Sequence, residues 1–282
     1  MSVSQPPQTK PIQAKRSQTG AAKSPLDRET LAEIVDLALR AGQLLMENGA
    51  ESQRVEVTVR SVGTGLGCDW GDVLVSHNAI VVSHISGREF RTKIRRVSRG
   101  GVNMSLIEQI SHLTHRIEEG KFDRAQVRAE LERISNYPRH YNRWLTVVAV
   151  GLACAAFSRL FSGDWPTFGV TLISAAVAMF VRQELTLRNF NSLLGVVASA
   201  LVAGSMVAVI YLLTEFSRQV GLALAASVLL LVPGVPFINA VEDLIKGYTV
   251  VGLARGATSA LIILAIALGL LIAMQLIGIS RL

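Results

Sequence analysis

Four polar residues in the last fifth of the chain have types and a spacing that could carry chemistry. They stand at i, i+3, i+4 and i+7, and they are Asn239, Glu242, Asp243 and Lys246. This spacing places them on one face of a helix. Such a face could line a polar pathway, in which a carboxylate relays protons or holds the ammonium group of an amino acid. The alternative is an ordinary amphipathic cytoplasmic helix, whose Glu242 and Lys246 pair in solvent.

A break in an apolar segment comes directly before these residues. Pro233 and Pro236 lack amide hydrogens and Gly234 permits unusual dihedral angles, so we expect the helix to break there. Backbone that is not helical is tolerated in a bilayer only where protein or a watery cavity satisfies it. Many secondary transporters bind their substrates at such breaks. We therefore expect a substrate or ion pathway here, to which Lys246 and Arg255 would add positive charge suited to a dicarboxylate.

The sequence gives less support to metal binding, disulfide formation or hydrolysis. His112 and His115 lie one helical turn apart without acidic or cysteine ligands at motif spacing, so we expect neither a metal nor a cofactor. Cys68 and Cys154 form no CxxC pair, which gives no sign of a disulfide framework. A membrane-anchored hydrolase is one alternative, and its loose candidates for a nucleophile and a base are Ser76, His77 and Ser83.

The composition divides the chain into two halves of different character. Of 282 residues, 50% are hydrophobic and 17% are charged. Residues 1–143 hold 21 Lys and Arg and 16 Asp and Glu, whereas residues 144–282 hold 7 and 5. Only the second half has the charge density of a membrane protein, which excludes a single soluble globule. The expected fold class is an α-helical membrane protein with about five transmembrane helices and an N-terminal cytoplasmic α+β domain.

The first half predicts a tail followed by one domain. Residues 1–26 are rich in Pro, Gln, Ser and Lys and have no apolar signal-peptide region, so we expect a disordered tail. Within residues 27–140, apolar periodicity predicts helices over 27–48, 51–62, 104–119 and 123–134. Short β-rich runs between residues 73 and 94 predict a small antiparallel sheet. These elements make the α+β domain.

Residues 141–282 form the predicted transmembrane domain. Its apolar runs predict spans at about 145–161, 166–181, 193–213, 220–238 with the break between Pro233 and Pro236, and 258–277. Small residues at Ala200, Gly204 and Ala208 suit close packing of the third span against another helix.

Basic residues near the spans are divided unequally between the two sides of the membrane. With the N-terminal domain inside, nine flank the spans on the cytoplasmic side and three on the outer side, which favours this orientation. Five spans would then leave Leu282 outside. The positive-inside bias also explains the net charge of +7 without a nucleic-acid partner.

Four stretches of the sequence resemble the threonine/serine exporter family. They are residues 43–56, 80–83, 232–239 and 252–255. The similarity covers about residues 28–280 and looks closest to the short, split form of the family, the YjjP-like subunits. It implies a multi-pass protein of the bacterial inner membrane whose missing half is on a second small membrane subunit, of the YjjB type. Split pairs are associated with succinate export, and full-length members with threonine and serine export.

The residues of the N-terminal domain that match this family follow its first helix. They are Gly49, Glu51, Ser52, Arg54 and Glu56. In one interpretation, Gly49 ends the first helix and Ser52 or Glu51 caps the second. In the other, these residues form a polar surface that gates the pore or contacts the partner.

These features together predict a subunit of a secondary exporter rather than an enzyme. We expect it to move small carboxylates or amino acids, succinate or threonine and serine, driven by an ion gradient or the membrane potential. The sequence has no nucleotide-binding motif, which argues against an ATP-driven pump. The expected partners are the second membrane subunit, the lipid bilayer and the cargo, and a homo-oligomer is left open. A scaffold or sensor that does not transport is the second alternative.

Overall fold

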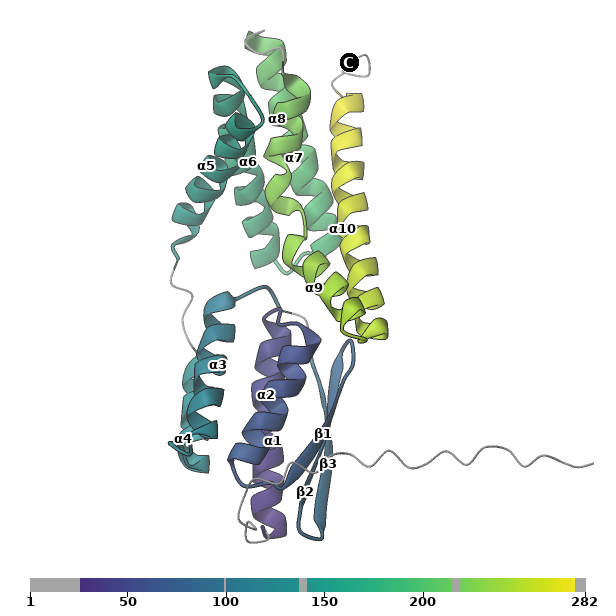
Figure 1. Ribbon diagram of the computed structural model, residues 1–282. Helices are drawn as coiled ribbons and strands as arrows, with labels where there is room; N and C mark the ends of the chain where they lie inside the picture. Colours follow the sequence, from purple (N-terminus) through teal and green to yellow (C-terminus); the bar gives the residue numbers. More distant parts are fainter. Residues whose placement is uncertain (1–25, 99, 137–140, 215–218, 277–282) are drawn as a thin grey trace, which may run out of the picture.

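The computed structural model describes residues 26–98, 100–136, 141–214 and 219–276. Two parts follow one another along a single long axis, an α+β domain and a bundle of apolar helices (Figure 1). The α+β domain comprises α1 (Arg28–Glu47), α2 (Ser52–Gly65), β1 (Trp70–Val75), β2 (Ala79–Ser86), β3 (Glu89–Arg96), α3 (Met104–Glu118) and α4 (Arg124–Ser135).

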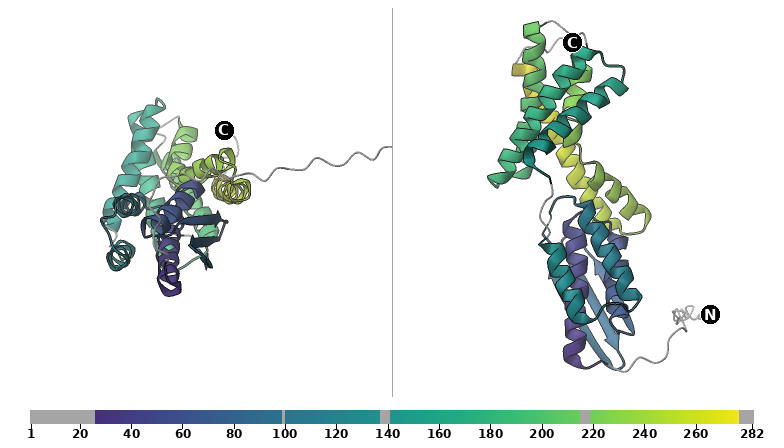
Figure 2. Two further views of the ribbon diagram at one scale, coloured as in Figure 1. Left: turned by 60° about the horizontal axis from the view of Figure 1, so that its bottom comes forward. Right: turned by 90° about the vertical axis from the view of Figure 1, so that its left-hand side faces the viewer.

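Helix α1 is the centre of the α+β domain. It packs against α2 and the sheet on one side and against α3 and α4 on the other (Figures 1 and 2). Its apolar residues are therefore buried almost all round rather than along one stripe, from Leu31 to Leu45. Asp27 caps its start by accepting a hydrogen bond from Thr30 N, and Gly49 follows its end with φ +88°. These are the boundaries that the periodicity predicts.

The three strands form an antiparallel sheet in the order β1-β2-β3. The residues that face the helices include Val75, Ile80 and Val82, which belong to the domain core. His84 is fully buried on this inner face, in a niche between two glycines. A Cβ on Gly63 or Gly71 would come within 2.0–2.1 Å of the imidazole ring. The glycines are therefore required by the close approach of this side chain.

The second part consists of long apolar helices. They are α5 (Arg143–Leu160), α6 (Trp165–Leu187), α7 (Ser192–Thr214), α8 (Val220–Ser227), the 3₁₀-helix η1 (Leu229–Leu231), α9 (Gly234–Ile245) and α10 (Thr249–Leu276). Among the described residues, four helices, α5, α6, α7 and α10, are long and apolar enough to cross a membrane. The pair of segments from α8 to α9 passes the same test as one span bent by 66°. The described residues therefore hold four to five candidate membrane spans, against about five expected from the sequence.

The helices differ from the predicted spans at their ends. Helix α6 continues to Leu187, and α10 begins at Thr249, nine residues before the predicted start, because charged residues end an apolar run without ending a helix. The break lies at Val232 and Pro233, and α9 continues to Ile245. Pro236 stands in the first turn of α9, where a missing amide hydrogen costs no intrahelical bond.

The predicted tail and domain boundary are described only in part. Leu26 belongs to the domain rather than to the predicted tail, because its N–H donates to Ser86 Oγ over 3.0 Å. Residues 1–25 and the boundary at residues 137–140 lie outside the described part of the chain.

Small residues bring α7 and α10 together. A Cβ on Gly204 would come within 2.8 Å of Ala273 Cβ, and one on Gly269 would come within 2.5 Å of the Val197 carbonyl oxygen. The stripe of Ala200, Gly204 and Ala208 predicted to pack closely is buried. Close backbone contact through small residues is the usual way in which apolar helices associate in lipid.

Candidate functional site

The loop between α1 and α2 presents backbone polar groups to the second part of the protein. The left-handed conformation of Gly49 turns the chain sharply after α1. The Gly49 and Ala50 carbonyls then lie near the end of α1, and the Ser52 N–H lies at the start of α2. Glu51 occupies the N-cap position of α2 but makes no side-chain cap hydrogen bond, and its carboxylate pairs with Arg54 at 3.2 Å. The predicted local cap is therefore absent.

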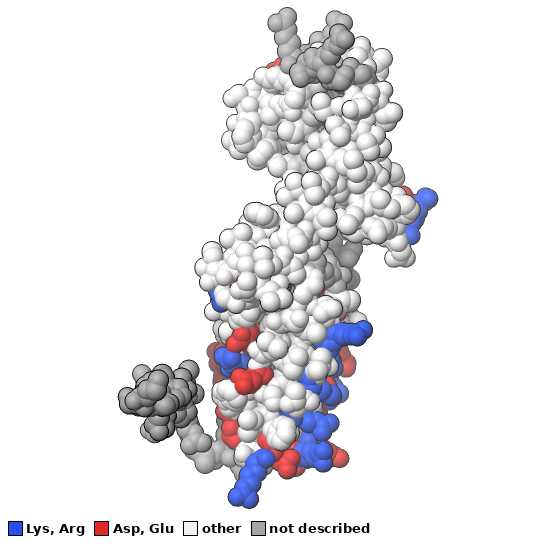
Figure 3. Space-filling view, turned by 90° about the vertical axis from the view of Figure 1, so that its right-hand side faces the viewer, with Lys and Arg blue, Asp and Glu red and all other residues white. Residues whose placement is uncertain are grey.

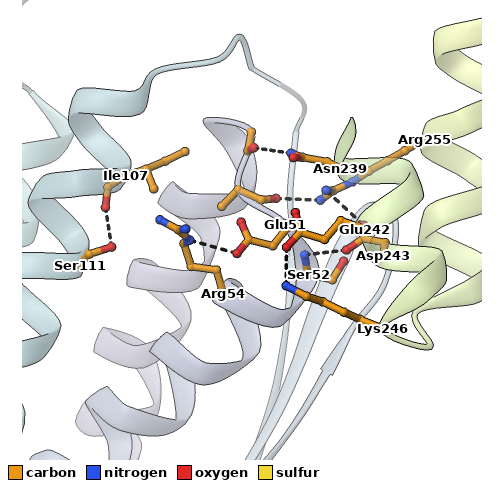
Figure 4. A network of polar contacts seen from close by, with 12 residues as sticks. Glu51, Ser52, Arg54, Ile107, Ser111, Asn239, Glu242, Asp243, Lys246 and Arg255 are labelled. Atoms are coloured by element: carbon orange, nitrogen blue, oxygen red, sulfur yellow. Dashed lines mark hydrogen bonds and ion pairs between the residues drawn. The ribbon is translucent and has the colours of Figure 1, made fainter. Parts of the chain in front are cut away.

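The opposite side of the site is the hairpin of α9 and α10. Gly247, with φ +88°, makes the turn between the two helices. Gly252 allows them to approach closely, since a Cβ there would lie 2.9 Å from the Ala240 carbonyl oxygen. Figure 4 shows Asn239, Asp243 and Arg255 of this hairpin pointing together at the loop between α1 and α2.

Three contacts join the loop to the hairpin, and a fourth, within the hairpin, joins two of the side chains that make them. Asn239 Nδ2 donates to the Gly49 carbonyl over 2.7 Å, and Arg255 Nη2 donates to the Ala50 carbonyl over 3.0 Å. Ser52 N–H donates to Asp243 Oδ1 over 2.9 Å, and Arg255 Nη1 lies 3.2 Å from Asp243 Oδ2. We call this set the domain clasp. Its members are Gly49, Ala50, Ser52, Asn239, Asp243 and Arg255.

The charges of the domain clasp match the ends of the two helices that it joins. Asp243 meets the N-terminus of α2, where the helix dipole is positive, and supplies the cap that α2 lacks locally. Arg255 and Asn239 meet carbonyl groups just beyond the C-terminus of α1, where negative potential favours donors. Asp243 is fully buried, and the Arg255 side chain is 11% exposed. A buried carboxylate without such partners would be costly.

A second contact lies beside the domain clasp. The Tyr248 hydroxyl, in the turn of the hairpin, donates to Glu56 Oε2 of α2. Burial raises the pKa of Tyr248 to about 12, and the Glu56 carboxylate adds to the rise. The hydroxyl therefore keeps its proton at physiological pH. Glu56 also pairs with Arg60 at 2.6 Å, so its carboxylate has one partner in the hairpin and one basic partner on its own helix.

The structure separates the predicted polar face of α9 into two groups. Asn239 and Asp243 bind the loop between α1 and α2, whereas Glu242 and Lys246 pair with each other, and their side chains are 37% and 29% exposed. This pair is the one that the amphipathic-helix alternative predicts. Pro233, Gly234 and Pro236 do not join the clasp, but they set the direction in which α9 leaves the bent span.

Two residues that make contacts between the α+β domain and the hairpin were not predicted as site residues from the sequence. Ala50 contributes only its carbonyl oxygen, and Tyr248 stands between two helices without a recognisable spacing. The contacts join residues about 190 to 205 positions apart, so no local pattern connects them. The one available signal was that both segments resemble the same family.

The fold and the clasp define a class of protein. Several apolar helices, one of them bent, follow an α+β domain that binds the hairpin after the bend. This arrangement is that of a multi-pass helical membrane protein with an attached globular domain. The sequence model described as "Putative threonine/serine exporter" matches residues 36–277. The chain belongs to this family of membrane transporters, which is not a family of enzymes.

Two relatives have nearly the same length as this chain. The chain is 37% identical to the "Probable succinate transporter subunit YjjP" of Klebsiella aerogenes, over 89% of this chain and 97% of the relative. It is 34% identical to the protein of the same name from Escherichia coli, over 87% and 95%. It is 22% identical to the "Probable threonine/serine exporter" of Mycobacterium tuberculosis, over 94% of this chain but 50% of that one. No solved structure matches the chain.

Membership of this family removes the hydrolase alternative. Its candidate Ser83 lies in the middle of β2, where its hydroxyl is 2.8 Å from that of Thr92. The remaining question concerns transport: what the protein moves, with which partner and by which driving force.

Proposed function

We propose that the chain is one subunit of a secondary exporter of small carboxylates or hydroxy amino acids in the bacterial inner membrane. The names of the two similar subunits favour succinate as the cargo, and that of the mycobacterial relative favours threonine and serine. The word "subunit" in the first two names supports a partner, which we take to be a second small membrane protein of the same family. The α+β domain would lie in the cytoplasm, as the distribution of basic residues favours.

The observation that carries this proposal is the bent fourth span and the way in which its second half is held. Helix α9 leaves the span at 66° to the segment before it, and the domain clasp binds α9 and the start of α10 to the α+β domain. Broken helices in transporters expose backbone groups that can bind cargo or ions. A hairpin held at its inner end would move with the domain, and the bend would open or close accordingly.

The length of α10 supports a position for the clasp at the membrane surface. At 1.5 Å per residue, its 28 residues extend about 42 Å, longer than a hydrocarbon core of about 30 Å. The uncharged stretch from Gly256 to Leu276 is sufficient to cross that core. Arg255 then marks the inner edge. The clasp would act as a gate beside the pathway, while Glu242 and Lys246 remain available to cargo, protons or the partner.

Flux measurements with both subunits would test the proposal. Liposomes containing the chain and its membrane partner should release succinate or threonine when a proton gradient or a membrane potential is imposed, without ATP. Replacement of Asp243 by Asn should slow the flux severalfold, because the clasp loses its charge pair but keeps a hydrogen-bond acceptor. Flux that requires ATP, or no flux of either cargo, would contradict the proposal.

The same assay separates a transporter from a scaffold. Replacements Glu242→Gln and Asn239→Ala remove one exposed carboxylate and one clasp donor. A scaffold that only assembles other membrane proteins would keep all transport intact in both variants. We expect flux to fall in at least the Asn239 variant, since its side chain binds the loop between α1 and α2 directly.

A further inference from the structure

The outer face of the sheet is apolar and uncovered by any described part of the chain. The strand register arranges its outward residues in three rows, Trp70–Ile85–Phe90, Asp72–Ser83–Thr92 and Leu74–Val81–Ile94. Four large side chains on the edge strands are 50–71% exposed, and they are Trp70, Leu74, Phe90 and Ile94. Contiguous apolar patches of this kind on a domain surface mark sites of association.

We propose that this face is a homodimer interface, in which two copies of the chain pack sheet against sheet about a two-fold axis parallel to the strands. The rows support a second copy as the occupant, because the pattern apolar, polar, apolar is complementary to itself. Packed face to face, each apolar row meets an apolar row and the polar row meets the polar row. Closed two-fold dimers bury the same patch on both subunits in this way.

A two-fold axis could run either along the strands or across them, and only one of these two arrangements is compatible with a single membrane. The strands and the apolar helices run along the same long axis of the molecule (Figures 1 and 2). A two-fold axis across the strands would place the two helical bundles at opposite ends, in separate membranes. An axis along the strands keeps both bundles side by side in one bilayer. Trp70 of one copy then meets Phe90 of the other, and Leu74 meets Ile94.

The charged residue on the outer face favours the same arrangement. Asp72 is the one charged residue in the three outward rows, and an axis along the strands places it opposite Thr92 of the other copy. Arg91, Lys93 and Arg95 of β3 alternate onto the helix side of the sheet, where Lys93 and Arg95 pair with Asp36 of α1. In Figure 3, which faces this side, the middle of the lower domain is largely white and many blue atoms gather along its right-hand edge. The alternative axis would place Asp72 opposite Asp72 of the other copy, which like-charge repulsion disfavours.

Cross-linking of the full chain in membranes tests this register. Two differently tagged copies, one with Asp72→Cys and one with Thr92→Cys, are expressed together in a background with Cys68→Ala and Cys154→Ala. Packed sheets lie about 10 Å apart, so a short bis-maleimide should join residues 72 and 92. The control pair carries Trp70→Cys and Ile94→Cys, whose rows are offset by about 13 Å along the strands. We expect severalfold more cross-linked dimer from the first pair than from the second.

A charge placed on the face gives a second readout. Added to the 72 and 92 pair, Leu74→Asp with Ile94→Asp should abolish the cross-link, whereas Val57→Asp, at an exposed site on α2, should preserve it. The proposal is overturned if the 72 and 92 pair yields no more dimer than the control pair. It is also overturned if the product joins this chain to a different protein, which would assign the face to the partner subunit. Neither result depends on the transported cargo.

Discussion

Asp243 has two partners that belong to different parts of the protein. Its carboxylate accepts the first N–H of α2 and also pairs with Arg255 of α10. Because the group is fully buried, the two partners together replace the water that it loses. Removal of either charge alone leaves the other uncompensated, so the cost exceeds that of an exposed ion pair.

A double-mutant cycle measures this coupling. We expect Asp243→Asn or Arg255→Met alone to destabilise the purified chain by about 3–5 kcal/mol, and the double variant to cost clearly less than their sum. The comparison variant is Arg133→Gln. It removes the exposed ion pair of Arg133 with Glu130, which should contribute about 1 kcal/mol or less to the free energy of unfolding. Thermal unfolding in detergent provides the measurement. Strictly additive effects would show that the two charges do not depend on each other.

The burial of His84 leads us to expect that the free energy of unfolding falls at mildly acidic pH. Burial lowers its pKa below the ordinary value of 6.5, so the unfolded chain takes up a proton before the folded chain does. Its contribution to stability is therefore complete above about pH 6.5 and decreases as the pH falls from there toward the lowered pKa of the folded state.

Unfolding midpoints between pH 7.5 and 5 test this assignment. The variant His84→Leu should flatten the pH dependence, because it fills the niche beside Gly63 and Gly71 without a titrating group. His112→Gln serves as the control, since the His112 side chain is 75% exposed. An unchanged slope in the His84 variant would assign the acid sensitivity to other residues.

At the scale of the elements, the approach of α9 to α10 determines whether the clasp can close. A Cβ on Gly252 would lie 2.8 Å from Leu244 Cγ and 3.0 Å from its backbone nitrogen. We expect Gly252→Ala to force the helices apart, to weaken the clasp and to lower the unfolding temperature. Gly256→Ala is the matched control on the same helix, because its Cβ would meet only Ala240 Cβ at 3.9 Å. That substitution should be neutral or stabilising, by up to about 1 kcal/mol. Equal losses in both variants would contradict this explanation.

The elements themselves were largely accessible from sequence, whereas their association was not. Apolar periodicity predicts α1 and the sheet because the residues that face the core repeat along the sequence at the period of a helix or of a strand. The start of α10 was placed too late because a charged residue such as Arg255 ends an apolar run but not a helix. The role of Asp243 as the cap of α2 could not be predicted, since the partners lie 191 residues apart and the contact uses a backbone N–H. The spacing of side-chain types along the sequence does not indicate a hydrogen bond to a distant backbone N–H.

At the scale of the whole molecule, the number of crossings fixes where each end lies. If the bent pair crosses once, five crossings place the α+β domain and the end of α10 on opposite sides of the membrane. The two lie at opposite ends of the molecule in Figure 1. We expect Lys121→Cys to react with an impermeant maleimide only after cells are opened. Phe161→Cys, in the turn between α5 and α6, should react in intact cells. Both variants require the background without Cys68 and Cys154, and labelling of residue 121 from outside would reverse the orientation.

The long separation between the two sides of the domain clasp also has a consequence during synthesis. Ser52 leaves the ribosome 191 residues before Asp243. At about 5–20 residues per second, that interval lasts about 10–40 s, during which the α+β domain can fold while the start of α2 is still uncapped. The clasp can close only after Asn239, Asp243 and Arg255 have also left the ribosome. Its closure therefore requires that synthesis has passed the start of α10, and the uncapped loop distinguishes chains that have not reached that point from chains that have.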